Sequence, residues 1–405
     1  MATFSTNTPL DQSNDTNYQT WVNEVLNALV TQCGISQSSD VCQLTPSNYN
    51  ASVVVNAQTA TNVLTINSVT SGGNNICVGM QVVGTSITAG TLITAVGSGT
   101  GGAGTYTLSN TVGTIAAESM TISLKAPAAL STSAGYCILK FNDTLQATAP
   151  VFFKLEFGSG ASGADYPQMW ITIGTGSNGS GSITWSGFGT TDGGASSATR
   201  VSCGQGSTPG QVTTNYASRY CYNSTQGVAF AILKIGGGAA GSGNSVIGFF
   251  VARTVSSSGA PNGNAVMLVT NASSNSGASG APVHQILSFT NSTMYGPVNP
   301  NNLSYSMSLY ATPAMAPTNT SRGSTIGQIF PAFQAQPSTS TGLNLGISNA
   351  MATAAFTEVA IGATVTATIL GTTSLTYINV GGLPFSGSTT TGFSTSAYGV
   401  LLLWQ

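Results

Sequence analysis

Charged side chains are scarce along this chain of 405 residues. Only 4% of its residues are Asp, Glu, Lys or Arg, against about a quarter in an ordinary globular protein. The eight basic residues form no cluster and the formal net charge is −2, so the sequence lacks the electrostatic attraction that nucleic-acid binding requires. A cytosolic monomer would be expected to keep more charge for solubility. The composition therefore argues against a genome-binding role and against a soluble enzyme.

Histidine is nearly absent, because His284 is the only one in the chain. A Ser/His/Asp arrangement needs a base, and His284 stands alone at the start of a predicted strand. There is also no HExxH, EF-hand or GxSxG motif. GxGxxG spacing begins at four glycines, but none of the four matches opens a helix or precedes a Walker lysine. We expect turns there, no catalytic residue and no cofactor; the four matches begin at Gly97, Gly158, Gly174 and Gly236.

The cysteines show no metal-binding spacing. The sequence has no CxxC pair and no histidine cluster beside a cysteine, which argues against zinc or any other metal site. Disulfides between Cys33 and Cys42 or between Cys203 and Cys221 are alternatives. Buried reduced thiols are the expectation for a large chain that is assembled in a reducing cytoplasm. The six cysteines are Cys33, Cys42, Cys77, Cys137, Cys203 and Cys221.

A secretion signal and a long apolar run are both missing. The first residues, MATFSTNTPLDQSND, lack the basic and apolar regions of a signal peptide. No stretch approaches the roughly 18 uninterrupted apolar residues of a membrane span. We therefore expect synthesis in the cytoplasm and no membrane insertion.

One amphipathic helix is predicted near the N-terminus, beginning at about Asp15 and stopping near Gly34. Its apolar side chains recur at helical spacing and must pack on something. The partner is either the body of the same chain or a neighbouring copy, for which the helix would serve as an assembly anchor. The contact residues in that second case are Tyr18, Trp21, Val22, Val25, Leu26 and Leu29.

Short strands dominate the rest of the sequence. With 41% hydrophobic residues and many β-branched runs, the chain is expected to fold despite its 50 glycines. The clearest strand is VFFKLEF, in which Phe153, Leu155 and Phe157 alternate with Lys154 and Glu156. Many such segments with one polar face predict an all-β fold of β-sandwich or jelly-roll type with a single N-terminal helix.

A Gly/Thr-rich segment carries a resemblance to known proteins. Residues 51–125 include NVLTINSVTSG followed by VGMQVVGTSITAGTLITAVGSGTGGAGTYTLSNTVGT, and no charged residue occurs between Asp40 and Glu118. This order of submotifs resembles a small β-module of bacteriophage tail and other virion proteins. The resemblance covers about a fifth of the chain and implies a structural role. It implies no catalytic residues.

The domain organisation that we predict has four parts. An N-terminal arm and helix occupy residues 1–50 and the β-module residues 51–125. A central β-sandwich follows in 126–311, and a linker with a C-terminal β-domain in 312–405. The segment YINVGGLPFSG resembles the C-terminal ends of some phage tail-fibre and receptor-binding domains.

The function expected from these observations is structural. We predict a virion component of tail, fibre or appendage type that binds copies of itself and other virion proteins. A trimer is implied by the resemblance to phage fibres, while other rings would fit a neck or baseplate.

Two alternatives involve the host surface. Loop aromatics could contact a glycan or protein receptor, and the candidates are Tyr166, Trp170, Trp185, Phe188 and Tyr220. A glycan depolymerase would need two carboxylates, for which Glu156, Asp165 and Asp192 are the candidates. Glu156 argues against cleavage, because its position beside Lys154 in the alternating strand is that of an ordinary charge partner.

Overall fold

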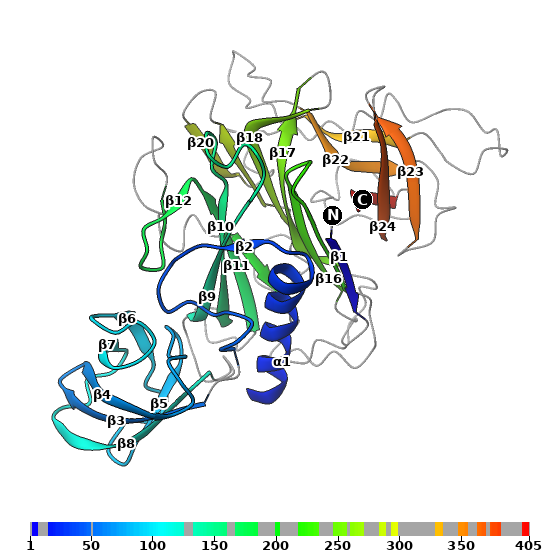
Figure 1. Cartoon of the computed structure of the whole chain (residues 1–405). Helices are drawn as coiled ribbons and strands as arrows, with labels where there is room; N and C mark the ends of the chain where they lie inside the picture. The colour runs from blue at the N-terminus through cyan, green and yellow to red at the C-terminus, as the bar shows by residue number, and fades with distance from the viewer. Residues whose placement is uncertain are drawn as a thin grey trace.

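The fold is known from a computed structural model. It describes residues 2–6, 15–49, 52–124, 133–159, 167–184, 199–202, 218–234, 246–256, 260–270, 283–288, 293–298, 329–334, 347–354, 363–369, 373–381 and 399–404. These residues form strands in several sheets and one α-helix, so the predicted all-β class is confirmed (Figure 1).

The largest sheet has twelve strands and draws on both ends of the chain. N-terminal β1 lies at one edge beside β15, and the C-terminal strands β21–β25 join the same sheet through β22. The predicted boundary at residue 311 therefore divides a hydrogen-bonded sheet. The twelve strands are β1 (Ala2–Thr6), β15 (Ser218–Asn223), β16 (Val228–Lys234), β17 (Val246–Val255), β18 (Pro261–Thr270), β19 (Val283–Ser288), β20 (Thr293–Val298), β21 (Ile329–Gln334), β22 (Ile347–Ala354), β23 (Thr364–Ile369), β24 (Thr373–Gly381) and β25 (Gly399–Leu403).

A five-stranded sheet faces β15–β17 across an aromatic core. Phe153 of β10 lies 5.8 Å from Phe249 of β17 between ring centroids, and Phe141 lies 5.7 Å from Tyr222 of β15. The alternation predicted for VFFKLEF is confirmed, because Phe153, Leu155 and Phe157 are fully buried in this core. The sheet runs in the order β14 (Thr199–Ser202), β11 (Pro167–Gly174), β10 (Phe152–Ser159), β9 (Ser133–Lys140) and β2 (Ser36–Gln37), and a hairpin of β12 (Gly176–Ser177) and β13 (Ile183–Thr184) follows β11.

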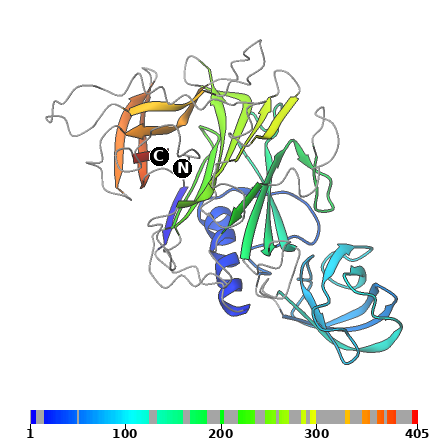
Figure 2. The same ribbon diagram turned by 180° about the vertical axis from the view of Figure 1, so that it is seen from behind.

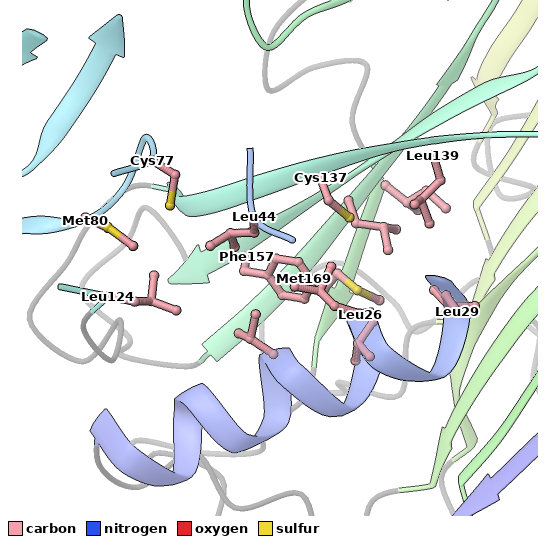
Figure 3. Close-up of a cluster of buried hydrophobic side chains, with 14 of the residues drawn as sticks. Leu26, Leu29, Leu44, Cys77, Met80, Leu124, Cys137, Leu139, Phe157 and Met169 are labelled. Atoms are coloured by element: carbon pink, nitrogen blue, oxygen red, sulfur yellow. The ribbon is translucent and has the colours of Figure 1, made fainter. Parts of the chain in front are cut away.

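The helix α1 (Asp15–Leu26) packs between these two sheets. Its Trp21 ring meets Phe157 of β10 edge-on at 5.4 Å, while Glu24 accepts a hydrogen bond from Tyr220 of β15. A π-helical segment, η1 (Asn27–Gln32), continues α1, and Gly34 follows with a φ of +75°. Figure 3 shows Leu26 and Leu29 directed toward Leu139 and Met169 of the five-stranded sheet. The helix is therefore an internal support of the sandwich.

Residues 52–123 form a separate six-stranded sheet that closes on itself. Its order is β5 (Gln81–Val83), β8 (Ile115–Ser123), β3 (Ser52–Ala60), β4 (Val63–Ser71), β7 (Gly104–Leu108) and β6 (Ile93–Val96). The two ends meet through a bridge between Gln81 and Leu92, with Ile93 N–H donating to Met80 O at 2.9 Å. We call this unit the closed module; it lies at one end of the molecule, near the start of α1 (Figure 2).

Candidate functional site

The helical stripe predicted as an anchor between copies lies inside the chain. All six of its side chains are 1% exposed or less, because both sheets of the sandwich contact α1 and η1. The alternative in which the helix packs on its own body is the one observed. The prediction that these side chains contact a neighbouring copy is therefore wrong. They belong to the core of their own chain, and they are Tyr18, Trp21, Val22, Val25, Leu26 and Leu29.

The predicted receptor contacts are not brought together among the described residues. Tyr220 is fully buried in β15 and its hydroxyl lies 3.1 Å from Glu24 Oε1, so its assignment as a receptor contact is wrong. Trp170 belongs to β11, where it pairs with Glu156 and Arg200. Tyr166, Trp185 and Phe188 lie outside the described residues, and the receptor prediction for them stays untested.

The carboxylates considered for glycan cleavage form no pair in the described structure. Glu156 lies 2.9 Å from Lys154 Nζ, which is the charge pairing expected from the sequence. Asp165 and Asp192 are outside the described residues, as is the His284 side chain. Across the described part of the chain, no group of three His, Cys, Asp or Glu side chains could hold a metal ion, and no helix is long and apolar enough to cross a membrane.

Buried polar clusters were not predicted. Asp40 accepts hydrogen bonds from the Tyr136 hydroxyl at 2.6 Å, from the Ser177 hydroxyl and from Gly181 N–H at 3.1 Å. Burial and the Asp40 charge raise the pKa of Tyr136, so its hydroxyl keeps its proton. These contacts tie the β12–β13 hairpin to the segment that follows β2. The only sequence signal is the rarity of charge, which makes each carboxylate beside apolar residues a candidate for burial.

The thiols of the described residues are unpaired. Cys33, Cys77, Cys137 and Cys221 are buried and Cys42 is half-buried, and all five are free. Burial raises the pKa of Cys33 to about 12 and that of Cys42 to about 11, so these thiols are poor nucleophiles near neutral pH. A Cys33–Cys42 disulfide is thus contradicted. Cys221 is free as well, and Cys203 lies outside the described residues.

The outer surface of the closed module is almost free of charge. Glu118 is its single charged residue, and that carboxylate accepts a hydrogen bond from Thr85 N–H at 2.8 Å. On neighbouring strands, Asn67 Nδ2 donates to Asn56 Oδ1 at 3.1 Å. Side chains of this kind present amides and hydroxyls and have little conformational entropy to lose on contact. Chemically, the module surface can form neutral hydrogen bonds, and Glu118 is its one acidic group.

Three strand edges of the sandwich and the module have a partner. In the closed module, β5 is joined to the segment that enters β6 by the Gln81–Leu92 bridge. Residues 36–44, which we call the edge strap, cover β9: Ser38 N–H donates to Ile138 O at 2.8 Å, and Ile138 N–H donates to Gln43 Oε1 at 2.8 Å. Strand β1 covers β15. These contacts occupy the edges of β9 and β15, while β1 and β14 remain end strands of their sheets.

Comparisons with known proteins assign no family to this chain. No protein-family model, no curated protein and no solved structure matches the chain.

Proposed function

We propose that this chain is a structural component of a bacteriophage virion, in a tail, fibre or other appendage, and that it works as a homo-oligomer. The observation that carries the proposal is the closed module, whose submotifs resemble a virion β-module and whose surface offers hydrogen bonds with a single charged residue, Glu118. Such a surface suits many identical copies packed at high local concentration, because like charges would repel one another there.

The buried interior supports the same proposal. Among the described carboxylates, Glu156 pairs with Lys154, Asp143 pairs with Arg253, and Asp40 and Glu24 accept hydrogen bonds from tyrosine hydroxyls. The described thiols are buried or half-buried. Rare ionisable groups that are used to tie elements together leave little catalytic equipment on the described surface.

The experiment for this proposal is peptide mass spectrometry of density-gradient-purified phage particles. We expect peptides of this chain at a constant ratio to the major tail proteins across the particle peak. A chain that is abundant in the lysate and absent from the particle peak would contradict the proposal. Light scattering on the purified chain then measures whether it forms the expected homo-oligomer.

A further inference from the structure

The turn between β12 and β13 contains an asparagine–glycine pair. Asn178 and Gly179 directly follow Ser177, and the sequence repeats this pair only once more, at Asn262–Gly263. Asn178 is exposed, and Gly179 has a φ of +80°. Because glycine has no Cβ, no side chain shields the Gly179 peptide nitrogen from the Asn178 amide group. The pair is therefore open to a reaction between a side-chain amide and the chain's own backbone.

The Asn178 amide oxygen lies between two backbone donors. Ser180 N–H donates to Asn178 Oδ1 at 2.8 Å, and Ser182 N–H donates to it at 3.0 Å. The Asn178 N–H in turn donates to Ser182 O at 3.0 Å, which fixes the backbone of the turn. A nucleophile that attacks the amide carbon Cγ places negative charge on Oδ1. Two preorganised N–H donors at these distances stabilise such a charge, as in an oxyanion hole.

The Gly179 N–H is connected to a buried carboxylate. It donates to Ser177 Oγ at 3.1 Å, and the Ser177 hydroxyl donates to Asp40 Oδ2. The Tyr136 hydroxyl holds the other carboxylate oxygen, Asp40 Oδ1, at 2.6 Å. The Gly179 carbonyl accepts a hydrogen bond from Val41 N–H of the edge strap at 3.4 Å. The Gly179 peptide group thus has a fixed orientation and a path along which its proton can reach a base.

We propose that Asn178 is a self-modification site, at which the side-chain amide becomes a carboxyl group through reaction with the Gly179 nitrogen. Gly179 N bonds to Asn178 Cγ, and its proton passes to Ser177 Oγ. The Ser177 hydroxyl proton passes to Asp40 at the same time. The Cγ–Nδ2 bond then breaks, and the leaving nitrogen takes a proton back through Ser177 and departs as ammonia. Water opens the resulting succinimide to aspartate or isoaspartate.

The proton path and the attack use different directions at the Gly179 nitrogen. The N–H that donates to Ser177 lies in the plane of the peptide, whereas attack on Cγ uses the electrons above that plane. The reaction needs only water as a co-reactant. Its product adds one negative charge at an exposed turn of a chain whose formal net charge is −2.

Conversion in the folded and in the unfolded chain tests the site without any substitution. The protein is incubated at neutral pH, either folded or in guanidinium chloride, and peptide mass spectrometry measures conversion of the Asn178 amide to an acid. We expect conversion at least about tenfold faster in the folded chain, because general-base catalysis contributes about 100-fold or more. Conversion at Asn178 that is no faster in the folded chain overturns the proposal.

The second asparagine–glycine pair is the matched control within the same chain. Asn262 Oδ1 accepts hydrogen bonds from Asn264 N–H at 3.0 Å and from the Thr254 hydroxyl. Among the described residues, these contacts of Asn262 do not lead to a carboxylate. Because β18 also restrains its backbone, we expect Asn262 to convert more slowly in the folded chain than in guanidinium chloride. Equal conversion of Asn262 and Asn178 in the folded chain would contradict the role of Ser177 and Asp40.

Substitution of Ser177 tests the proton path. Ser177→Ala removes the hydroxyl between Gly179 and Asp40, so we expect conversion at Asn178 to fall at least about tenfold with no change at Asn262. Ser177→Thr keeps a hydroxyl and should retain most of the rate. An unchanged Asn178 rate in Ser177→Ala overturns the path. None of these rates depends on the proposed virion role, so the two proposals fail independently.

Discussion

Arg253 of β17 binds Asp143, in the loop between β9 and β10, with two side-chain nitrogens, and thereby ties the two sheets of the sandwich together. Its Nη2 lies 2.9 Å from Asp143 Oδ1, and its Nε donates to Oδ2. The side chains are 0% and 5% exposed, and the guanidinium also lies over the Phe141 ring at 5.7 Å. In a chain with so few charges, this pair is a structural clasp between sheets.

Breaking the clasp from one side should be costly. Asp143→Ala leaves the Arg253 charge buried without its partner, so we expect the free energy of unfolding to fall by about 3–5 kcal/mol. The double variant Asp143→Leu/Arg253→Met should lose less than the single variant, because no buried charge remains. Denaturant unfolding measures both. Equal losses in the single and double variants would show that the charge is not the cause.

Glu24 should make stability depend on pH. Burial is the main cause that raises its pKa from 4.5 to about 7, while the hydrogen bond from Tyr220 acts in the opposite direction. Since the folded pKa is above the unfolded one, the stabilising contribution is full below pH 4.5 and is lost as the pH rises through 7.

The substitution Glu24→Gln should therefore raise the free energy of unfolding at pH 8, by about 1–3 kcal/mol, and change it little at pH 4.5. Thermal unfolding across this pH range measures the difference. Tyr220→Phe serves as the comparison, because loss of its hydrogen bond should raise the pKa of Glu24 further. A Glu24→Gln effect that is the same at pH 4.5 and pH 8 would contradict the account.

The glycines of the turn around residue 101 should be needed for folding of the closed module. Gly101 has a φ of +96°, its N–H donates to the Tyr106 hydroxyl at 3.1 Å, and an added Cβ would lie 2.7 Å from Asn74 O. Gly113 also has a positive φ, +76°, but nothing lies within 4 Å of a Cβ there.

We expect Gly101→Ala to destabilise the chain by about 1–3 kcal/mol more than Gly113→Ala, because only the first adds a clash to backbone strain. Thermal unfolding of the two variants isolates the close contact from the strain. If both cost the same, the turn around Tyr106 can relax and the clash is unimportant.

The purified oligomer should resist salt. With one charged residue on the module surface and few elsewhere in the chain, contacts between copies should depend on neutral hydrogen bonds and apolar area. Raising NaCl from about 0.1 to 1 M shortens the Debye length from about 10 to 3 Å and should leave the oligomer mass unchanged. Dissociation at 1 M salt in analytical ultracentrifugation would contradict this account of the interfaces.

Local patterns in the sequence predict the strands and the helix well. Alternation places Phe153, Leu155 and Phe157 on one face, and a 3.6-residue period places Trp21 and Val25 in the core. Both patterns are set by neighbours along the chain. They could not reveal which body the helix packs on, since an apolar stripe is the same for an internal and an external partner.

Long-range contacts account for what the sequence did not predict. The closure of the module between Gln81 and Leu92, the pairing of β1 with β15, and the clasp between Asp143 and Arg253 all join segments without a local signal. Tyr220 was misassigned for the same reason, because its burial depends on α1, nearly 200 residues earlier in the chain. Local sequence patterns therefore cannot predict these long-range contacts.

Immunogold electron microscopy of intact phage particles, with antibody against the purified chain, tests the central claim most directly. The account predicts label on particles, concentrated on the tail or its projecting appendages. Particles without label, in preparations where the same antibody detects the chain in the lysate, would contradict a structural role in the virion.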